Sequence, residues 1–421
     1  MSLVVAKFGG TSLADLERIR VVAGHIASCR DEGHDVVVVV SAMAGDTDRL
    51  IGLGTSVVNR PDPREMDVLL AAGEQVSVAL VAMAVQERGM KARSFLASQI
   101  RVRTVGKHMK AKIQSVEVKG LQEDIASGVI PVIAGFQGIG ADGDLTTIGR
   151  GGSDTTAVAV AAALEADECR IYTDVEGVHT ADPRIVEHAQ KLDRVVCEEM
   201  LEMAALGAKV LHTRCVEYAH RYSVPLRVLS SFQKGSGTLI CEEGENDEME
   251  RPVVSAVTHD RNEAKLTVTR VPDKPGLAYR LLGPIGEAGI SVDMIVQNVG
   301  VESLTDMTFT VKREDYQQSQ EILRASIAEL SDELSEDQVK HMNVVGDDSI
   351  AKVTVVGVGM RSHAGVATTM FETLAHYGIN IQMISTSEIK ISVIIHEDFC
   401  ELAVRALHSA FELDVANPLA N

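Results

Sequence analysis

The sequence predicts a layered α/β domain with a mostly parallel central sheet, followed by two small α+β modules of ferredoxin-like topology. Apolar runs alternate with amphipathic segments through residues 1–240, which is the pattern of strands and helices in such a domain. Five consecutive valines, Val36–Val40, suit a strand buried on both faces of a parallel sheet. Further along, Ala264–Ile295 is similar to Ala351–Ile384, which indicates a duplicated module.

The elements of the first domain follow from their hydrophobic patterns. Strands are predicted at Leu3–Phe8, Val36–Val40, Ile130–Phe136, Arg170–Thr173 and Leu226–Leu229. Helices are predicted between them, among others at Asp15–Cys29, Glu65–Arg88 and Asp154–Ala166.

The repeat defines the C-terminal half. Each copy reads as strand, glycine-containing turn, helix, glycine stop and strand, with Gly276 matching Gly365. A strand and a helix then follow each copy, at Met307–Val311 and Asp315–Leu330, and at Lys390–Ile395 and Glu397–Phe411. The order βαββα, with one more strand to be found, predicts two ferredoxin-like modules.

Domain boundaries follow from an acidic, polar segment, CEEGENDEMERP, that begins at Cys241 and ends at Pro252. We predict domains at 1–240, 254–340 and 341–421, with a linker at 241–253. The sequence leaves open which small module contains the strand at 253–257.

Composition excludes several classes of protein. A formal net charge of −20 argues against nucleic-acid and anionic-membrane partners, although a small anionic ligand needs only a local group of cations. The six cysteines show no CxxC spacing, so reduced thiols are expected rather than a zinc site or a disulfide framework. The N-terminus has no signal-peptide pattern, and the Ala-rich run Thr156–Leu164 is too short to span a membrane. These features predict a soluble cytoplasmic protein.

A lysine and two glycines come at the end of the first predicted strand. Gly9 and Gly10 allow the backbone to turn and bring its N–H groups close to an anion, and Lys7 adds a positive charge. This combination is typical of phosphate sites, although a lone lysine at a strand end is more often a solvated cap. Neither the Walker A pattern nor the dinucleotide fingerprint is present.

A second glycine-rich stretch precedes an Ala-rich helix. Gly149, Gly151 and Gly152 lead into it, and Ser153 or Asp154 is expected to cap its N-terminus. Free N–H groups and the positive end of the helix dipole would then face a ligand. Because Arg150 and Asp154 carry opposite charges, the turn suits a zwitterion.

A third stretch, IYTDVEGVHTADPRIV at Ile171–Val186, contains two turns. Asp174 and Asp182 are candidate magnesium ligands, and Arg184 is a candidate phosphate contact. Taken alone, the stretch also fits an ordinary loop.

Together, KFGGTS, GRGGSDTTA, YTDVEGV, TADPR and the run Ser385–Glu388 resemble the sequences of aspartate kinases, which have the amino-acid kinase fold. The resemblance covers essentially the whole chain, and the two repeats resemble ACT domains. Other amino-acid kinases share the fold but not this pair of glycine-rich motifs with a tandem ACT tail. The resemblance implies an αβα sandwich with a mostly parallel central sheet, followed by two α+β ACT domains.

The resemblance implies the reaction L-aspartate + ATP → 4-phospho-L-aspartate + ADP, with Mg²⁺ as a further cofactor, at the start of the lysine, threonine and methionine branch of amino-acid biosynthesis. A carboxylate nucleophile is already ionised near neutral pH, so no general base is required. Catalysis is then positioning plus cationic stabilisation of the transferring group. Lys7, Arg150 and Asp154 are the expected catalytic residues.

The resemblance also assigns binding residues. Aspartate is expected to contact Ser41, Thr47, Glu74, Arg150, Gly151, Gly152, Ser153 and Asp154, with Arg150 on the α-carboxylate and Glu74 on the ammonium group. ATP is expected to contact Lys7, Phe8, Gly9, Gly10, Thr11, Ser12, Thr173, Asp174, His179, Thr180, Ala181, Asp182, Pro183, Arg184, Lys209 and Val210. The magnesium ligands are left open.

The ACT repeats are expected to bind lysine, threonine or both as feedback inhibitors. The expected contacts are Asp273, Lys274, Pro275, Gly276, Leu277, Ala278, Asp293, Met294, Gln297 and Asn298 in the first copy, and Met360, Arg361, Ser362, Asn380, Ile381, Thr386, Ser387 and Glu388 in the second. Asp273 and Asp293 are candidates for an effector ammonium group. A homo-oligomer formed through these domains is expected, or a complex with a regulatory fragment translated separately from Met249.

Two other interpretations remain open from the sequence. One is a kinase for another small acidic substrate. The other is an amino-acid sensor with an inactive kinase domain, against which Lys7, Arg150 and Asp154 argue because all three are present.

Overall fold

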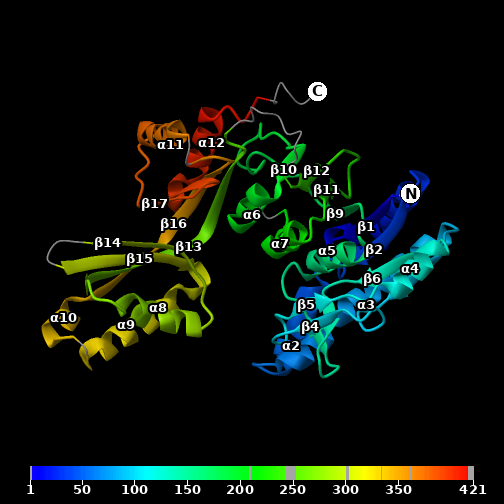
Figure 1. Cartoon of the computed structure of the whole chain (residues 1–421), viewed down its shortest axis with the longest axis horizontal. Helices are drawn as coiled ribbons and strands as arrows, with labels where there is room; N and C mark the ends of the chain where they lie inside the picture. The colour runs from blue at the N-terminus through cyan, green and yellow to red at the C-terminus, as the bar shows by residue number, and fades with distance from the viewer. Residues whose placement is uncertain are drawn as a thin grey trace. The chain divides into compact units, whose positions relative to one another are not determined.

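The computed structural model describes residues 2–207, 210–242, 253–299, 303–332, 334–360 and 363–415 (Figure 1). The chain forms two compact units. Met1–Thr180 and Gln190–Arg251 make the first, and Ala181–Ala189 and Pro252–Asn421 make the second.

The first unit is built on an eight-stranded sheet with the order β10-β12-β11-β9-β1-β2-β6-β3. Its strands are β1 (Leu3–Phe8), β2 (Asp35–Val40), β3 (Ala92–Phe95), β6 (Ile130–Ala134), β9 (Glu168–Thr173), β10 (Arg194–Val196), β11 (Leu226–Ser230) and β12 (Thr238–Cys241). Every neighbouring pair is parallel except β11 and β12. The mostly parallel sheet is therefore confirmed.

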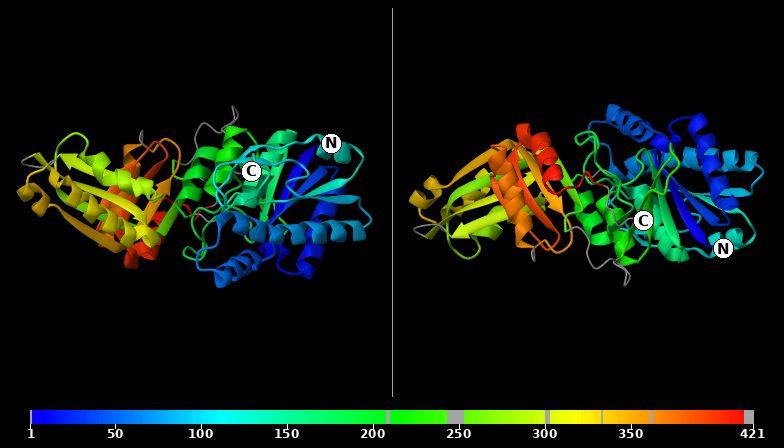
Figure 2. Two further views of the ribbon diagram at one scale, coloured as in Figure 1. Left: turned by 90° about the horizontal axis from the view of Figure 1, so that it is seen from below. Right: turned by 90° about the horizontal axis from the view of Figure 1, so that it is seen from above.

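Helices cover both faces of this sheet (Figure 2). The helices of the unit are α1 (Leu16–Asp31), α2 (Asp46–Val57), α3 (Pro63–Glu87), α4 (Lys119–Ala126), α5 (Gly152–Leu164), α6 (Cys197–Ala205) and α7 (Thr213–Arg221). Alternate residues of β1 and β2, such as Phe8 and Val38, pack against α1 and α3, while α5 contacts β1, β2 and β9. The valines of β2 are fully buried because helices lie on both sides, as a parallel sheet requires.

A small second sheet was not predicted from the sequence. It has the order β5-β4-β7-β8 and consists of β4 (Arg103–Val105), β5 (Lys112–Ser115), β7 (Gln137–Ile139) and β8 (Leu145–Thr147). Three or four residues per strand are too few to give an alternating pattern. The predicted strand Ile130–Phe136 ends earlier, at Ala134, and Phe136 has a left-handed φ of 67°.

The helix α3 is long and apolar enough to span a membrane by length and composition alone, and it is the one such helix among the described residues. Half of its most apolar window is buried inside the fold. It packs on α1 and on strands of the main sheet, and its buried face includes the acidic residues Asp67 and Glu74. These contacts are those of a core helix in a layered domain.

The second unit contains a six-stranded sheet with the order β14-β15-β13-β16-β18-β17. Its strands are β13 (Ala256–Pro272), β14 (Val292–Val299), β15 (Leu304–Lys312), β16 (Asn343–Val356), β17 (Met383–Thr386) and β18 (Lys390–His396). Its helices are α8 (Leu277–Glu287), α9 (Tyr316–Glu329), α10 (Glu336–His341), α11 (Ala364–His376) and α12 (Cys400–Ala410). Each copy of the repeat thus has the predicted βαββα order.

The two copies exchange strands. The first part of β13, Ala256–Asp260, pairs with the second half of β16, and Val254 and Val257 lie in the same hydrophobic core as α11 and α12. Conversely, Val344 at the start of β16 lies in the core of the first copy with α8 and α9. The strand at 253–257 therefore belongs to the second module. The predicted boundary between residues 340 and 341 therefore separates each exchanged strand from the module whose core it completes.

Candidate active site

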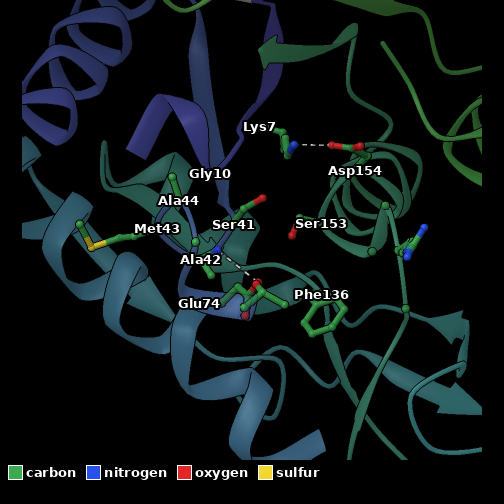
Figure 3. A pocket seen from close by; sticks show the side chains of 16 residues that line it. Lys7, Gly10, Ser41, Ala42, Met43, Ala44, Glu74, Phe136, Ser153 and Asp154 are labelled. Carbon is green, nitrogen blue, oxygen red and sulfur yellow. Dashed lines mark hydrogen bonds and ion pairs between the residues drawn. The ribbon is translucent and has the colours of Figure 1, made fainter. Parts of the chain in front are cut away.

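A cleft of about 350 Å³ opens in the first unit, where the carboxyl ends of β1 and β2 meet the start of α5 (Figure 3). Parallel strands place their carboxyl ends at one edge of the sheet, and this edge is the usual ligand site of open α/β sheets. The cleft is lined by Lys7, Gly10, Ser41, Ala42, Met43, Ala44, Gly45, Thr47, Glu74, Phe136, Gly149, Arg150, Gly151, Gly152, Ser153 and Asp154.

Lys7 and Asp154 form an ion pair on one wall of the cleft. Lys7 Nζ lies 2.5 Å from Asp154 Oδ1, and the two side chains are 10% and 15% exposed (Figure 3). Asp154 Oδ1 is itself buried, and the Lys7 ammonium group is its charged partner. Because β1 and α5 supply one partner each, the pair fixes the cation between the glycine-rich turn and the helix.

The turn after β1 packs tightly on its neighbours. Gly9 donates a backbone hydrogen bond to the carbonyl of Tyr172 on β9, and a Cβ on Gly10 would lie 3.2 Å from the Ala42 carbonyl oxygen. Ser12 is buried and its hydroxyl lies 2.5 Å from that of Ser231, so its side chain faces the protein interior. Phe8 is buried in the core as well.

Glu74 lies at the base of the cleft and is 3% exposed. Its Oε1 accepts a hydrogen bond of 3.1 Å from the Ala42 N–H, while Oε2 is buried and accepts no hydrogen bond from the described residues (Figure 3). Burial raises the pKa of Glu74 to about 7. An orphaned carboxylate oxygen inside a ligand-sized cleft marks a place for a hydrogen-bond donor, and a cation would satisfy it best.

The start of α5 differs from the sequence prediction. The helix begins at Gly152, and the cap is Gly151 with φ 67°, so Ser153 and Asp154 lie in the first turn rather than at the cap. A Cβ on Gly151 would come within 2.4 Å of the His212 Cβ. Ser153 faces the cleft (Figure 3). Arg150 also lines the cleft but is exposed, and it forms no ion pair with any described residue.

Ser41 and Thr47 approach from the loop after β2 and the start of α2. The Ser41 N–H donates to the Phe8 carbonyl, which joins the ends of β2 and β1. Both side chains line the cleft and are partly exposed. The cleft thus brings together every residue that the sequence assigned to aspartate.

The residues assigned to ATP are less concentrated. Thr173 and Asp174 end β9 beside the Gly9 turn, and the Thr173 hydroxyl donates to Asp174 at 3.0 Å. Further along the same unit, His179 forms an isolated bridge with Lys191, and Thr180 is buried. Val210 is described, whereas Lys209 lies outside the described residues.

The TADPR motif divides after Thr180, because Ala181, Asp182, Pro183 and Arg184 belong to the second unit. There Ala181 packs in the core of the second module. Arg184 lies 2.7 Å from Asp182 and holds the pKa of that carboxyl below its usual value. Arg184 is thus engaged locally.

Several side chains that support the cleft were missed by sequence reasoning. Asp67 on α3 is fully buried and accepts hydrogen bonds from Thr147 and from the Met109 N–H, and it lies 2.6 Å from His108. Arg214 on α7 donates to the carbonyls of Ile148 and Ala111, both at 2.8 Å. These contacts hold the segment before Arg150. Such partners are far apart in sequence, so no local pattern reveals them.

Phe136 was placed in a strand by the sequence but lines the cleft. Its ring packs on Gly152, where a Cβ would lie 2.7 Å from Phe136 Cδ2. This close approach explains why the helix must start with glycine.

The effector candidates of the first ACT copy are dispersed. Gly276 caps α8 with φ 94°, Asp273, Lys274, Pro275 and Ala278 are exposed on that turn, and Leu277 is buried. Gln297 and Asn298 are exposed on β14, whereas Met294 is buried.

Asp293 is already paired within the chain. Its carboxylate contacts the ammonium group of Lys352 on β16, whose side chain is only 3% exposed. Lys352 also lies 3.2 Å from Glu263. An effector ammonium group would therefore have to displace Lys352 to reach Asp293 in this arrangement.

The described candidates of the second copy fall into two groups. Met360 is buried and its N–H donates to the Glu388 carbonyl, while Thr386 and Ser387 end β17 and start that turn. Asn380 is exposed, and Ile381 lines a separate cavity of about 360 Å³ together with Lys265 and Gln382. Arg361 and Ser362 lie outside the described residues.

Comparisons with known proteins agree with this architecture. Residues 2–230 match the amino acid kinase family, and residues 265–328 and 353–411 each match an ACT domain. The chain is 55% identical to the aspartokinase of Pseudomonas aeruginosa over 98% of both chains.

Solved structures agree as well. The chain is similar to E. coli aspartokinase III in complex with aspartate and ADP, in its R-state, with 27% identity, a TM-score of 0.78, and 97% and 99% of the two chains covered. The T-state structure of that enzyme with lysine and aspartate gives a TM-score of 0.73, at the same identity and coverage. The chain therefore belongs to the amino acid kinase family, and within it to the aspartokinases, which carry a kinase domain followed by two ACT domains.

Proposed function

We propose that the chain transfers the γ-phosphoryl group of ATP to the side-chain carboxylate of L-aspartate, forming 4-phospho-L-aspartate and ADP. The observation that carries the proposal is the cleft itself. It combines a buried ammonium group, Lys7, with an orphaned carboxylate oxygen on Glu74 and the guanidinium of Arg150, which pairs with no described carboxylate. The solved structure of E. coli aspartokinase III holds aspartate and ADP.

Aspartate has one cation and two anions, and the cleft offers a counterpart for the groups that do not react. Glu74 Oε2 has an unused acceptor position for the α-ammonium group. Arg150 at the rim can grip the α-carboxylate with two parallel hydrogen bonds. Ser41, Thr47 and Ser153 add hydroxyl groups around the side chain. The reacting carboxylate is thereby directed toward Lys7.

The transfer needs charge stabilisation more than proton transfer, because the nucleophile is already an anion. Lys7 faces the charge that develops on the transferring phosphoryl group, and Asp154 holds its ammonium group in place. The backbone N–H of Gly10 and those at the start of α5 favour the phosphate oxygens.

Magnesium fits one group of this unit. Asp174 is an exposed carboxylate at the end of β9, one strand from Lys7, and carboxylate oxygens with waters are the usual ligands of Mg²⁺. Bound there with ATP, the ion would neutralise phosphate charge. Asp182 is the weaker candidate because Arg184 already pairs with it.

We further propose that lysine, threonine or both inhibit the enzyme through the ACT domains, which places the reaction at the start of the branch that makes these amino acids. Support comes from the two ACT domain matches and from E. coli aspartokinase III, whose T-state structure contains lysine. Assembly through the ACT domains, a separate regulatory fragment from Met249 and a cytoplasmic location remain predictions, and Met249 lies outside the described residues.

The test is release of ADP from ATP and Mg²⁺ with L-aspartate, with L-glutamate as the matched control, and with lysine, threonine and both added. Turnover with aspartate that an effector suppresses is the expected result. Turnover with glutamate instead would indicate another acidic substrate. Binding of lysine or threonine without any turnover would support an amino-acid sensor and contradict the proposed reaction.

A further inference from the structure

Three side chains with metal-binding chemistry lie close together near the C-terminal end of α7 in the first unit. Cys197 starts α6, His220 is near the end of α7, and Glu242 follows β12. Their ligand atoms, a sulfur, a ring nitrogen and a carboxylate oxygen, all lie within 4.8 Å of one another. Within the described residues, no other group of three His, Cys, Asp or Glu side chains meets this criterion.

We propose that Cys197, His220 and Glu242 bind a divalent transition-metal ion, with Zn²⁺ as the best fit. Zinc takes mixed sulfur, nitrogen and oxygen ligands at about 2.0–2.3 Å, which puts neighbouring ligand atoms roughly 3.3–3.8 Å apart. Because the ligand atoms lie up to 4.8 Å apart, they must approach one another by roughly 1 Å to bind the ion. His220 and Glu242 have room to move, since their side chains are 40% and 42% exposed. Mg²⁺ and Ca²⁺ fit poorly because they prefer oxygen ligands alone.

The surroundings of the thiol favour a cation. Cys197 is 2% exposed, and its sulfur lies within 4.8 Å of the carboxylate of Glu242. A divalent cation between the two would be neutralised by the carboxylate and by the thiolate that it binds. His220 Nδ1 already lies 2.9 Å from Glu242 Oε1, so two of the three ligands are held together before a metal arrives.

A neighbouring thiol supplies a contrast. Cys241 is adjacent to Glu242, but its sulfur accepts a hydrogen bond of 3.0 Å from Arg194 Nε. With Cys241 engaged, three protein ligands remain, and water fills the fourth position of a tetrahedral ion. Cys241 is therefore the matched control for Cys197.

A metal here would fasten two parts of the unit. Glu242 directly follows β12, and the metal would tie it to α6 and α7. The other end of α7 contacts the cleft, since His212 lies against Gly151 and Arg214 donates to the Ile148 carbonyl. Binding should thus stabilise the unit that contains the cleft against unfolding.

The experiment uses the full chain without a histidine tag, treated with EDTA and dialysed. Co²⁺ replaces Zn²⁺ as the probe, because a thiolate bound to Co²⁺ gives a charge-transfer absorption band. One equivalent of Co²⁺ should produce this band, and Zn²⁺ should remove it and raise the Tm. Cys197→Ser should abolish the band, and Cys241→Ser should retain it. His220→Ala should weaken binding by at least about tenfold, since even outer-shell changes at metal sites cost that much.

Two results would overturn the proposal: no thiolate band in the unmodified chain, or a band of equal intensity and affinity in Cys197→Ser. Circular dichroism of each metal-free variant checks folding. If Cys197→Ser fails to fold, His220→Ala and Glu242→Gln change exposed side chains and test the same site. Unchanged Zn²⁺ affinity in both of these variants would then contradict it.

Discussion

At the scale of single residues, Lys7 is the cation that the proposed transfer depends on. Removing it in Lys7→Ala deletes a preorganised charge that acts on the transition state. We expect kcat to fall by about 10²–10³-fold, with little change in the KM for aspartate, because Glu74 and Arg150 remain. Steady-state ADP release measures both constants.

Lys91→Ala is the control for this prediction, since Lys91 is exposed and outside the cleft. Its constants should match those of the unmodified enzyme. A Lys7→Ala enzyme with normal kcat and a raised KM would show that Lys7 only binds substrate.

Glu74 gives the cleft a titratable switch near neutral pH. Its carboxylate must be ionised to hold an ammonium group, and burial raises its pKa to about 7. The kcat/KM for aspartate should therefore rise with pH through about 7. In Glu74→Gln the KM should increase by roughly 10–100-fold, as expected for the loss of a charged hydrogen bond, and this pH dependence should vanish. A pH profile that is identical in the variant would assign the titration to another group.

The same residue predicts an effect on stability. Its folded pKa is above its unfolded value, so the unfolded chain binds fewer protons between these pKa values, and Glu74 costs stability as the pH rises. Glu74→Gln should thus be more stable than the unmodified protein at about pH 8, on the order of 1–3 kcal/mol, and similar to it at about pH 4. Urea unfolding at both pH values measures the difference.

At the scale of elements, the start of α5 is shaped by steric limits. Gly151 has a left-handed φ, and a side chain there would also overlap His212. Gly151→Ala should cost about 1–2 kcal/mol for the backbone and roughly another 1–3 kcal/mol for the overlap, and it should raise the KM for aspartate by displacing Arg150.

Gly128→Ala separates these two costs. Gly128 has φ 75°, but no atom lies within 4 Å of the place that its Cβ would take, so it should incur only the backbone cost and leave kinetics unchanged. Equal loss of stability in the two variants would show that His212 moves aside freely.

Elements with strong local patterns were predictable, and those held by distant partners were not. The valine run indicated β2, and the glycines after β1 and before α5 located the cleft, because strand ends and helix starts meet at one sheet edge. The small sheet of β4, β5, β7 and β8 was not predicted, since strands of three or four residues are too short to show an alternating pattern. The hydrogen bonds of Asp67 were not predicted either, because they join residues that are far apart in the sequence. The predicted cap of α5 was wrong, because the space around the true cap, Gly151, is limited by the start of α7, which is far away in the sequence.

At the scale of the whole molecule, the exchange of strands makes the two ACT modules interdependent. Val254 and Val257 lie at the start of the first module in sequence but pack in the core of the second, and Met342 and Val344 lie at the start of the second but pack in the core of the first. The sequence repeat suggested two separate modules, one after the other. A repeat shows that two segments are similar, but it does not show which module an additional strand joins. Each module therefore needs residues from outside its own sequence boundaries to complete its hydrophobic core.

This interdependence predicts how fragments behave. A fragment of residues 253–342 should fail to fold, because it lacks the β16 segment that pairs with β13 and exposes Val254 and Val257. A fragment of residues 253–415 contains both exchanged strands and should unfold in one cooperative transition. Dispersed amide resonances and a single calorimetric peak would identify the folded fragment. A well-folded 253–342 fragment would mean that the first module closes its core without β16, and that the two modules fold independently after all.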